Sequence, residues 1–532
     1  MDLTEASAST RSGHPSATRD GVPARTRTDG PPWLKIATGF ALFLAVVVRF
    51  ATVSPLWLDE AQTVAIAKLA LGDIVEGLRH DGAPPLFYFL LHGWIGVFGD
   101  GDLAVRFLSG LFGVACLPLA WLAGRRLGGS TVGWSAVLLL AASPFAVRYA
   151  TEARQYSMVM ALVLVGYLAL TELLERPRST RAAAGVAATT GALLLSHYWA
   201  IYLLFVVGVT LVVLVRRTPA ESPMRAGARR GLVSMAAGSL AFLPWVPSFL
   251  YQLKHTGTPW GAPGRLRSTI DTVFHFSGGY WDPGLLLGMI TYVLMALALV
   301  GRAVDGRRVE LDLRTRPGGR HLAVVGFGTL VVAILATVIG RSAFAVRYAA
   351  VMFPMVVLLA ALGTRVLLDR RVRHGVLAVA VVSGFWAIAP NVFGDRTSAD
   401  RVAAALAAGV QPGDVVGYCP DQLGPSVSRL LPEDFAGTQL TFPRGTPPHI
   451  VDWVDYAKVN EASDPAAFAQ LLLDRAGATG TVWMVWAPGY RTFEDKCQGI
   501  LGNLDLARRN NTRPVKLPRN FEKPGLIRFL PG

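Results

Sequence analysis

The stretch that decides the fold lies near the start of the chain, where residues 33–60 read WLKIATGFALFLAVVVRFATVSPLWLDE. Its first part is an apolar run of about the 20 residues that a helix needs to cross the hydrocarbon core of a membrane. The stretch ends with an aromatic residue, Trp57, and an acidic pair, Asp59 and Glu60. It therefore predicts a membrane span that carries two carboxyl groups to a membrane surface.

The composition extends this prediction to most of the 532-residue chain, because 52% of the residues are hydrophobic and only 16% are charged. Such a chain is too apolar for an ordinary soluble protein. The formal net charge of +15 does not indicate a nucleic-acid partner, because the basic residues form short clusters between apolar runs. We therefore expect a polytopic α-helical protein of the plasma membrane that binds no nucleic acid.

Apolar runs of spanning length predict about eleven transmembrane helices. They lie near residues 33–53, 102–124, 131–147, 156–174, 183–197, 199–215, 231–250, 284–301, 321–340, 347–366 and 375–393. Every second loop between them is rich in arginine, and by the positive-inside rule these loops are cytoplasmic. The N-terminus is then cytoplasmic, and the part of the chain after the last span is extracytoplasmic.

Three segments complete the expected organisation around a transmembrane domain of residues 33–393. Residues 1–32 are rich in Ser, Thr, Gly and Pro and predict a disordered cytoplasmic tail. Pro84–Phe98 is apolar but too short for a span, which favours a helix at the membrane interface. Residues 394–532 are more polar and alternate between strand and helix patterns, so they predict a small α/β domain.

Within that C-terminal domain the pattern predicts strands at 413–418 and 481–486 and helices at 421–431 and 466–476. Its two cysteines, Cys419 and Cys497, could form a disulfide if the domain lies outside the cytoplasm. The alternative is two separate thiols.

The acidic pair is the sharpest candidate for a functional site. Successive residues of a helix point about 100° apart, so Asp59 and Glu60 cannot face one ligand in the same way. We expect one carboxylate to act and the other to support it. The alternative is that both are acids favoured by the dipole at a helix N-terminus.

Other polar residues lie on the same predicted outer side. His80 and Asp81 precede two prolines that would hold them in a rigid loop. His80 could bind a phosphate or a hydroxyl group, or it could be a solvated surface histidine. His197 lies at the outer end of a span, where aromatic neighbours are expected in any case. Arg347 begins a span from the outer side, against the positive-inside trend, so a phosphate at the membrane surface is its expected partner.

A further outer turn holds Glu152, Arg154 and Tyr156. If this stretch is helical, Glu152 and Tyr156 share a face at positions i and i+4, and Arg154 points elsewhere. The alternative is a set of charges that snorkel at a helix end.

In combination these features resemble a known family. The features are Asp59-Glu60 after the first span, the sequence PPLFY at 84–88, Arg106 followed by Ser109 and Gly113, and the sequence EARQY at 152–156. They resemble the family 39-type GT-C glycosyltransferases, which include protein mannosyltransferases and aminoarabinose transferase-like enzymes. The resemblance covers roughly residues 33–393. Where some relatives have lysine ahead of the two prolines, this chain has His80-Asp81-Gly82-Ala83.

The resemblance implies a polyprenyl-phosphate-linked sugar donor, an active site at the outer membrane face and inversion at the anomeric carbon. It also implies that Asp59 is the general base for the acceptor hydroxyl. The acceptor could be an envelope glycan, a lipid or a protein, and mannose, arabinose and other sugars remain open as donors. The expected substrate-binding residues are Glu60, His80, Asp81, Glu152, Arg154, Tyr156, His197 and Arg347.

The chemistry of these side chains agrees with such a role. Sugar transfer from a phosphate-linked donor needs a base and positive groups that stabilise the departing phosphate. Asp59 can serve as the base, and Arg347, Arg154 and His80 are candidates for the phosphate. The sequence requires no cofactor, although Asp59, Glu152 and His80 are plausible ligands of a divalent metal.

Two other classes of function compete with this interpretation. One is a transporter or lipid flippase, and the other is a scaffold whose outer domain binds cell-wall polymer. Transporters often show internal repeats and ionisable residues near the middle of the bilayer. This sequence shows no repeat, and its acids lie at span ends, which favours the transferase.

Overall fold

The computed structural model describes residues 32–340, 342–493, 495–517 and 521–531. The chain divides into two units between Phe40 and Ala41. The expected disordered tail of residues 1–32 lies outside the described residues except for Pro32, which begins the first helix.

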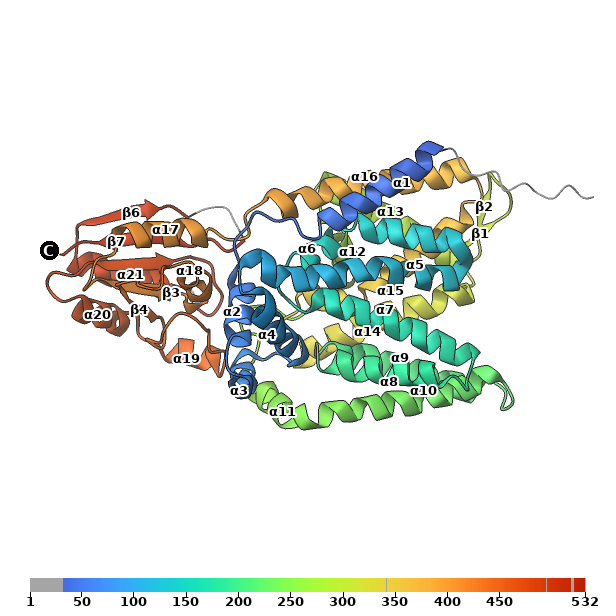
Figure 1. Ribbon diagram of the computed structural model, residues 1–532, viewed down its shortest axis with the longest axis horizontal. Helices are drawn as coiled ribbons and strands as arrows, with labels where there is room; N and C mark the ends of the chain where they lie inside the picture. Colours follow the sequence, from blue (N-terminus) through green and yellow to red (C-terminus); the bar gives the residue numbers. More distant parts are fainter. Residues whose placement is uncertain (1–31, 341, 494, 518–520, 532) are drawn as a thin grey trace, which may run out of the picture. The chain divides into compact units, whose positions relative to one another are not determined.

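The first part of the chain is helical throughout (Figure 1). Its helices are α1 (Pro32–Val47), α2 (Leu58–Ala67), α3 (Leu71–Asp81), α4 (Leu86–Phe98), α5 (Asp102–Ala141), α6 (Pro144–Ala150), α7 (Tyr156–Glu175), α8 (Thr180–Leu194), α9 (Ala200–Arg217), α10 (Pro223–Ser239), η1 (Leu240–Trp245) and α11 (Val246–His255). The next part adds α12 (Ser268–Phe276), α13 (Asp282–Val300), the hairpin strands β1 (Gly301–Ala303) and β2 (Val309–Leu311), α14 (Pro317–Ile339), η2 (Val346–Val351), α15 (Phe353–Gly363), η3 (Thr364–Val366) and α16 (Arg370–Phe393).

Within the described residues, seven of these helices, counting α10 to α11 as one, are long and apolar enough to cross a membrane. Each of the eleven expected spans overlaps a helix of the structure. The second and third spans lie on the two arms of α5. The arms meet at Gly128 and Gly129, and Gly129 has φ 80°, a backbone conformation that favours glycine. The polytopic helical fold is thus confirmed, whereas the count of eleven crossings stays a prediction.

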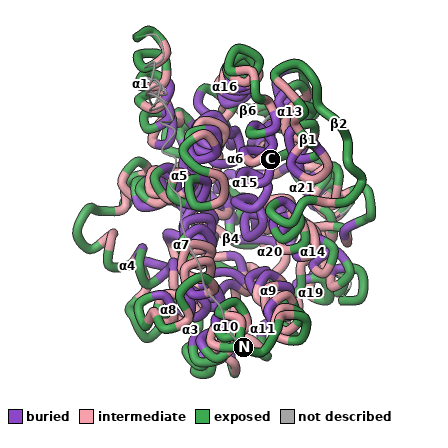
Figure 2. Tube along the Cα trace, turned by 90° about the vertical axis from the view of Figure 1, so that its right-hand side faces the viewer, coloured by how far each residue is buried: buried purple, intermediate pink, exposed green. Residues whose placement is uncertain are grey.

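The long helices pack around one large apolar core, to which α5, α7, α9, α13, α14 and α15 contribute. Buried residues line the sides of the helices that face one another, and exposed residues lie on the outer sides (Figure 2). Many of the exposed side chains on the candidate spans are themselves apolar, such as Phe205, Val293, Leu335 and Trp386. An apolar outer surface on long helices is what a lipid environment requires.

The loop between the first two expected spans folds into α2, α3 and α4. α4 matches the helix expected within Pro84–Phe98. α3 ends at Asp81 and is followed by Gly82 with φ 87°, a left-handed helix end that only glycine adopts readily. Asp81 is therefore the last residue of a helix, and His80 lies one position before it.

The C-terminal part forms a separate sheet structure. Its elements are α17 (Ala399–Gly409), β3 (Val415–Cys419), η4 (Asp421–Leu423), α18 (Gly424–Ser428), β4 (Thr438–Thr441), α19 (Tyr456–Ala462), α20 (Pro465–Ala476), β5 (Val482–Trp486), α21 (Lys496–Ala507), β6 (Asn511–Val515) and β7 (Gly525–Phe529). The strand order is β4-β3-β5-β7-β6. The pairs of β3 with β4 and β5 are parallel, and the pairs of β7 with β5 and β6 are antiparallel.

Helices cover both faces of this sheet. On β3, Val416 and Tyr418 face an apolar layer with α17, whereas Val415 and Cys419 face a layer with α20 and α21, as the two-residue period of a strand dictates. The small α/β domain is thus confirmed. A disulfide joins Cys419 to Cys497. The helix expected at 421–431 is shorter than predicted, because it consists of η4 and α18 and ends at Ser428.

Candidate active site

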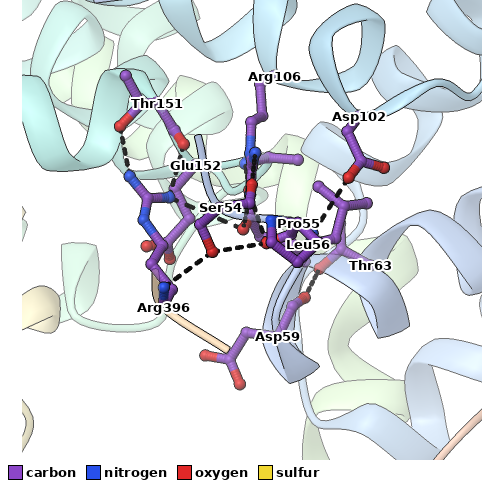
Figure 3. Close-up of polar contacts among 12 residues, drawn as sticks. Ser54, Pro55, Leu56, Asp59, Thr63, Asp102, Arg106, Thr151, Glu152 and Arg396 are labelled. Carbon is purple, nitrogen blue, oxygen red and sulfur yellow. Dashed lines mark hydrogen bonds and ion pairs between the residues drawn. The ribbon is translucent and has the colours of Figure 1, made fainter. Parts of the chain in front are cut away.

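Asp59 and Glu60 lie in the first turn of α2, and their side chains diverge as helix geometry requires. The Asp59 side chain is 16% exposed and the Glu60 side chain is fully buried. The Asp59 carboxylate points away from Arg106 (Figure 3), and it lies 3.5 Å from the Arg347 guanidinium. Of the two acids, only Asp59 is placed to meet a substrate.

Glu60, next to Asp59 in the sequence, makes buried ionic contacts with two arginines. Its two carboxylate oxygens accept hydrogen bonds of 2.7 and 2.6 Å from the Arg106 guanidinium, and one also accepts from the backbone N–H of Ala153 at 2.9 Å. Arg396 lies 3.7 Å away. Burial alone would raise the pKa of the Glu60 carboxyl, but Arg106 and Arg396 outweigh it and lower that pKa. We therefore assign Glu60 a structural role in place of substrate contact.

Glu152 belongs to the same set of buried charged residues, the buried ionic layer, which consists of Glu60, Arg106, Glu152 and Arg396. Its side chain is 1% exposed and lies 3.2 Å from the Arg148 guanidinium. Burial raises the pKa of the Glu152 carboxyl, an effect that Arg148 opposes and nearby Glu60 reinforces. Arg396 completes the layer by donating to the backbone oxygen and the hydroxyl of Thr151 at 2.7 and 2.6 Å (Figure 3).

The segment around Glu152 is not helical, so the condition for a shared face of Glu152 and Tyr156 is not met. Residues 151–155 form a bend between α6 and α7, because Ala153 gives its backbone N–H to Glu60 and not to a helix. Arg154 does point away from Glu152, which pairs with Arg148. The bend turns Arg154 back toward α2, where it donates to the Thr63 hydroxyl at 2.6 Å and to the Asp59 backbone oxygen at 3.4 Å.

Arg154 connects Asp59 to Asp81 through Tyr88. The Arg154 guanidinium donates to the Tyr88 hydroxyl at 3.2 Å, and that hydroxyl donates to Asp81 at 2.8 Å. Gln62 also donates to Asp81 at 2.5 Å. Burial raises the pKa of the Asp81 carboxyl, and Arg154 is the largest influence that opposes the rise. Asp81 therefore lies close to the site with its hydrogen-bonding capacity largely used by the protein.

Arg347, in η2, is surrounded by aromatic rings. Its guanidinium carbon lies 4.9 Å from the Trp260 ring centroid, 5.5 Å from that of Tyr348 and 6.0 Å from that of Trp57. Cation–π contacts of this kind fix a guanidinium without neutralising its charge. The Arg347 side chain is 20% exposed, so this positive group can meet an anionic ligand.

His197 and Tyr156 line the same region. The His197 ring lies 5.8 Å from the Tyr156 ring and 5.4 Å from the Tyr348 ring. Its Nδ1 accepts a hydrogen bond of 3.1 Å from the Trp199 backbone N–H. Burial, together with the charges of Arg154 and Arg347, lowers the pKa of His197 to about 3. His197 is therefore neutral at physiological pH.

His80 does not join this group. Its Nδ1 lies 2.8 Å from an Asp452 carboxylate oxygen of the sheet domain, and its Nε2 lies 3.5 Å from Glu76. The backbone N–H of Trp453 donates to the His80 carbonyl at 3.0 Å. His80 therefore anchors the sheet domain to the helical part. The structure also gives no support to a metal at Asp59, Glu152 and His80, because the described residues contain no group of three or more potential His, Cys, Asp or Glu ligands.

Two further residues of the family-like pattern, Ser109 and Gly113, support the bend before α7 and the end of α6. The Ser109 hydroxyl donates to the Arg154 backbone oxygen at 3.0 Å and so stabilises the bend. Gly113 leaves room for Ala150, because a Cβ on Gly113 would lie 2.6 Å from the Ala150 Cβ. These contacts explain why a small residue and a hydroxyl suit these two positions.

Several contributors were not among the expected site residues: Thr63, Tyr88, Arg396, Tyr348 and Trp260. Tyr88 lies in the quoted PPLFY stretch, and Tyr348 adjoins Arg347, so the sequence carried a local signal for these two. Arg396 and Trp260 carried none, since each is recognised only by its contacts with distant residues.

The arrangement is one accessible carboxylate beside two guanidinium groups and a neutral imidazole. All these groups come from one end of the helical bundle: from the start of α2 and from the segments before α7, α9 and α15. Such a set can remove a proton from a hydroxyl and stabilise a departing anion at the same place.

Comparisons with known proteins show one family match and one similar fold. Residues 82–242 match the family model described as dolichyl-phosphate-mannose-protein mannosyltransferase. The fold is similar to that of ArnT from Cupriavidus metallidurans in the apo state, with a TM-score of 0.59, 13% identity and coverage of 93% of this chain and 97% of that chain. It is also similar to ArnT bound to undecaprenyl phosphate, with a TM-score of 0.55, 14% identity and coverage of 94% and 98%. No curated protein sequence matches the chain.

Part of the chain thus matches a family model of glycosyltransferases, and its fold is similar to that of the membrane protein ArnT. Both findings agree with the resemblance of the sequence to the GT-C glycosyltransferases.

Proposed function

We propose that this enzyme transfers a sugar from a polyprenyl-phosphate-linked donor to an acceptor in the cell envelope, with Asp59 as the general base. The observation that carries the proposal is the pairing of Asp59 with Arg347, both partly accessible, above a buried ionic layer. The solved structure of ArnT with undecaprenyl phosphate, which has the same fold, supports a polyprenyl phosphate as the donor's carrier.

In the proposed reaction the Asp59 carboxylate takes the proton of the acceptor hydroxyl. The acceptor oxygen attacks the anomeric carbon, and the bond from that carbon to the phosphate oxygen breaks. The polyprenyl phosphate leaves with the electron pair. A single displacement of this kind inverts the anomeric configuration and needs one base, unlike the two carboxylates of a retaining glycosidase.

Arg347 and Arg154 would stabilise the phosphate that leaves. Arg347 is held by its aromatic neighbours and is 20% exposed, so a phosphate can replace Asp59 as its partner. Arg154 also lies next to Asp59, because its guanidinium donates hydrogen bonds to the Asp59 backbone oxygen and to the Thr63 hydroxyl. His197 is neutral and adds no charge, and with Tyr156 it would line the sugar site. Glu60, Asp81 and Glu152 would support these groups without contacting the sugar, and His80 would hold the sheet domain to the helical part.

The reaction would take place at the outer membrane face. The arginine-rich loops lie at the opposite ends of the spans from Asp59, because Arg216 and Arg217 end α9, whose start adjoins His197. By the positive-inside rule the N-terminus is then cytoplasmic and the sheet domain extracytoplasmic. The acceptor, as a glycan, lipid or protein of the envelope, would approach from that side.

The test is transfer of radiolabelled sugar from a polyprenyl-phosphate donor by purified D59N protein, with D73N as a matched control. Asp73 is an exposed aspartate near the start of the adjacent helix α3. Loss of a general base lowers the rate by about 10²–10⁴-fold, so D59N should be slower by that factor and D73N should match wild type. A D59N rate equal to that of wild type would refute the role of Asp59.

A further inference from the structure

A short segment of the sheet domain, residues 451–455, is hydrogen-bonded to three helices of the helical part. We call it the docking segment. Every second backbone N–H group of this segment donates to the helical part, at 3.1, 3.0 and 2.8 Å in turn: Val451 to the Gln62 side chain of α2, Trp453 to the His80 carbonyl of α3 and Asp455 to the His255 carbonyl of α11. The docking segment therefore holds the sheet domain against the helix that carries Asp59.

Gln62 differs from the other two partners because it meets the docking segment with its side chain. It is buried, with an exposed fraction of 2%. Its Oε1 accepts the bond from Val451, and its Nε2 donates to the Val451 carbonyl at 3.3 Å and to the Asp81 carboxylate at 2.5 Å. A reversed amide would point its oxygen at two other acceptors, so these bonds fix one orientation of the amide.

Asp81 connects Gln62 to Arg154. One Asp81 oxygen accepts from Gln62, and the other accepts from the Tyr88 hydroxyl at 2.8 Å. That hydroxyl accepts in turn from Nη1 of Arg154 at 3.2 Å. The same nitrogen donates at 2.6 Å to the hydroxyl of Thr63, the residue that follows Gln62 on α2. Three hydrogen bonds in series therefore join the Gln62 amide to the Arg154 guanidinium.

We propose that Gln62 is a positioning residue, by which the docked sheet domain keeps Arg154 in place. A buried carboxylate needs hydrogen-bond donors. Without the Gln62 amide, Asp81 would turn toward Arg154, the nearest positive group, and draw the guanidinium away from the departing phosphate. The sheet domain is then part of the active site and not only a separate binding module. This inference rests on the proposed role of Arg154 in stabilising that phosphate.

Methionine is the matched substitution for Gln62. Its unbranched side chain fills a similar space, but it has no N–H donor and only a weak acceptor. Q411M, at an exposed glutamine of the sheet domain, is the control for the same chemical change. A second arm introduces Q62M into an R154A background. The experiment measures kcat, the KM for a polyprenyl-phosphate sugar and the thermal unfolding midpoint of each purified variant.

We expect Q62M to lower kcat by about 10- to 100-fold, because a misplacement of about 1 Å can cost 10²-fold. The donor KM should stay close to that of wild type, since the phosphate gains its second charge only as it departs. Q411M should match wild type.

The R154A background shows whether Gln62 acts through Arg154. R154A should lower kcat by about 10²-fold. In that background Q62M should lower kcat by no more than about twofold further, because the effects of two residues that act through one group do not add. A side chain that only stabilises the fold would lower kcat by the same factor in both backgrounds.

Three results would overturn the proposal: a wild-type kcat in Q62M, an equal effect of Q62M with and without Arg154, or a Q62M loss that follows only the fraction of folded protein. The single variants separate it from the proposed function. If R154A or D59N kept the full rate, the role proposed for that residue in the transfer reaction would fail whatever Q62M does. If both were slow and Q62M were normal, only the positioning role of Gln62 would fail.

Discussion

Replacing Glu60 with glutamine probes the buried ionic layer beneath Asp59. Glu60 is fully buried and is bonded by Arg106 through both carboxylate oxygens, with Arg396 3.7 Å away. The amide of glutamine can accept one of the two Arg106 bonds and carries no charge. Both guanidinium groups are then left buried without their counterion, a change that costs about 3–5 kcal/mol. A loss of that size is a large fraction of the stability of most domains.

The assay is thermal unfolding of purified protein in detergent, followed by tryptophan fluorescence, for wild type, E60Q and the control E76Q. The Glu76 side chain is 61% exposed, and surface ion pairs contribute little, so E76Q should unfold within a degree or two of wild type, at a cost of about 0–1 kcal/mol. E60Q should unfold at a clearly lower temperature. An E60Q midpoint equal to that of wild type would refute the reasoning about the buried layer.

The pH dependence gives a second check on Glu60. Its pKa is lowered in the folded protein from an ordinary value of 4.5. A group with a lowered folded pKa stabilises the protein fully above its unfolded pKa, and the stabilisation is lost as the pH falls through the folded value. The difference between wild type and E60Q should therefore be constant above about pH 5 and shrink below pH 4.5. A difference that grows on acidification would contradict the assignment of a charged Glu60.

Three further predictions test other parts of the account. R347A should lower kcat/KM for the polyprenyl-phosphate donor by about 10²-fold, as for the loss of one charge-stabilising donor, whereas R265A, at an exposed arginine of the same outer segment, should match wild type in steady-state kinetics. D452N removes the carboxylate partner of His80 and should therefore speed proteolysis of the segment after Phe393. The control is D434N, at an exposed aspartate. Equal digestion rates of the two variants would argue against an anchoring role for His80. A cysteine at Glu433 should react with a membrane-impermeant maleimide in intact cells and a cysteine at Arg307 should not, and the reverse pattern would overturn the proposed topology.

Much of the fold follows from local sequence patterns. Apolar runs of spanning length predicted the positions of the helices, because the length and apolarity of a single run are enough to indicate a membrane span. The strand β3 was predictable because its apolar run follows a tight turn, and β5 from its own short apolar run. The divergence of Asp59 and Glu60 followed from the helical angle alone.

The parts that the sequence could not predict depend on partners far along the chain. Residues 151–155 have a helix-compatible composition, but the Glu60 carboxylate takes the Ala153 N–H and produces a bend. His80 was a candidate for phosphate binding, yet Asp452 lies within 2.8 Å of it. Arg396 shows no local feature that marks it as a partner of Glu60. Contacts of this kind are set by tertiary packing and leave no periodic signal.

The most direct test of the central claim is single-turnover sugar transfer by D59N with the polyprenyl-phosphate donor bound at saturation before the acceptor is added. If Asp59 is the base, the rate of the transfer step should fall by about 10²–10⁴-fold, while the dissociation constant of the donor, measured in the same preparation, should stay within a few-fold of wild type. A D59N transfer step as fast as that of wild type would contradict the account.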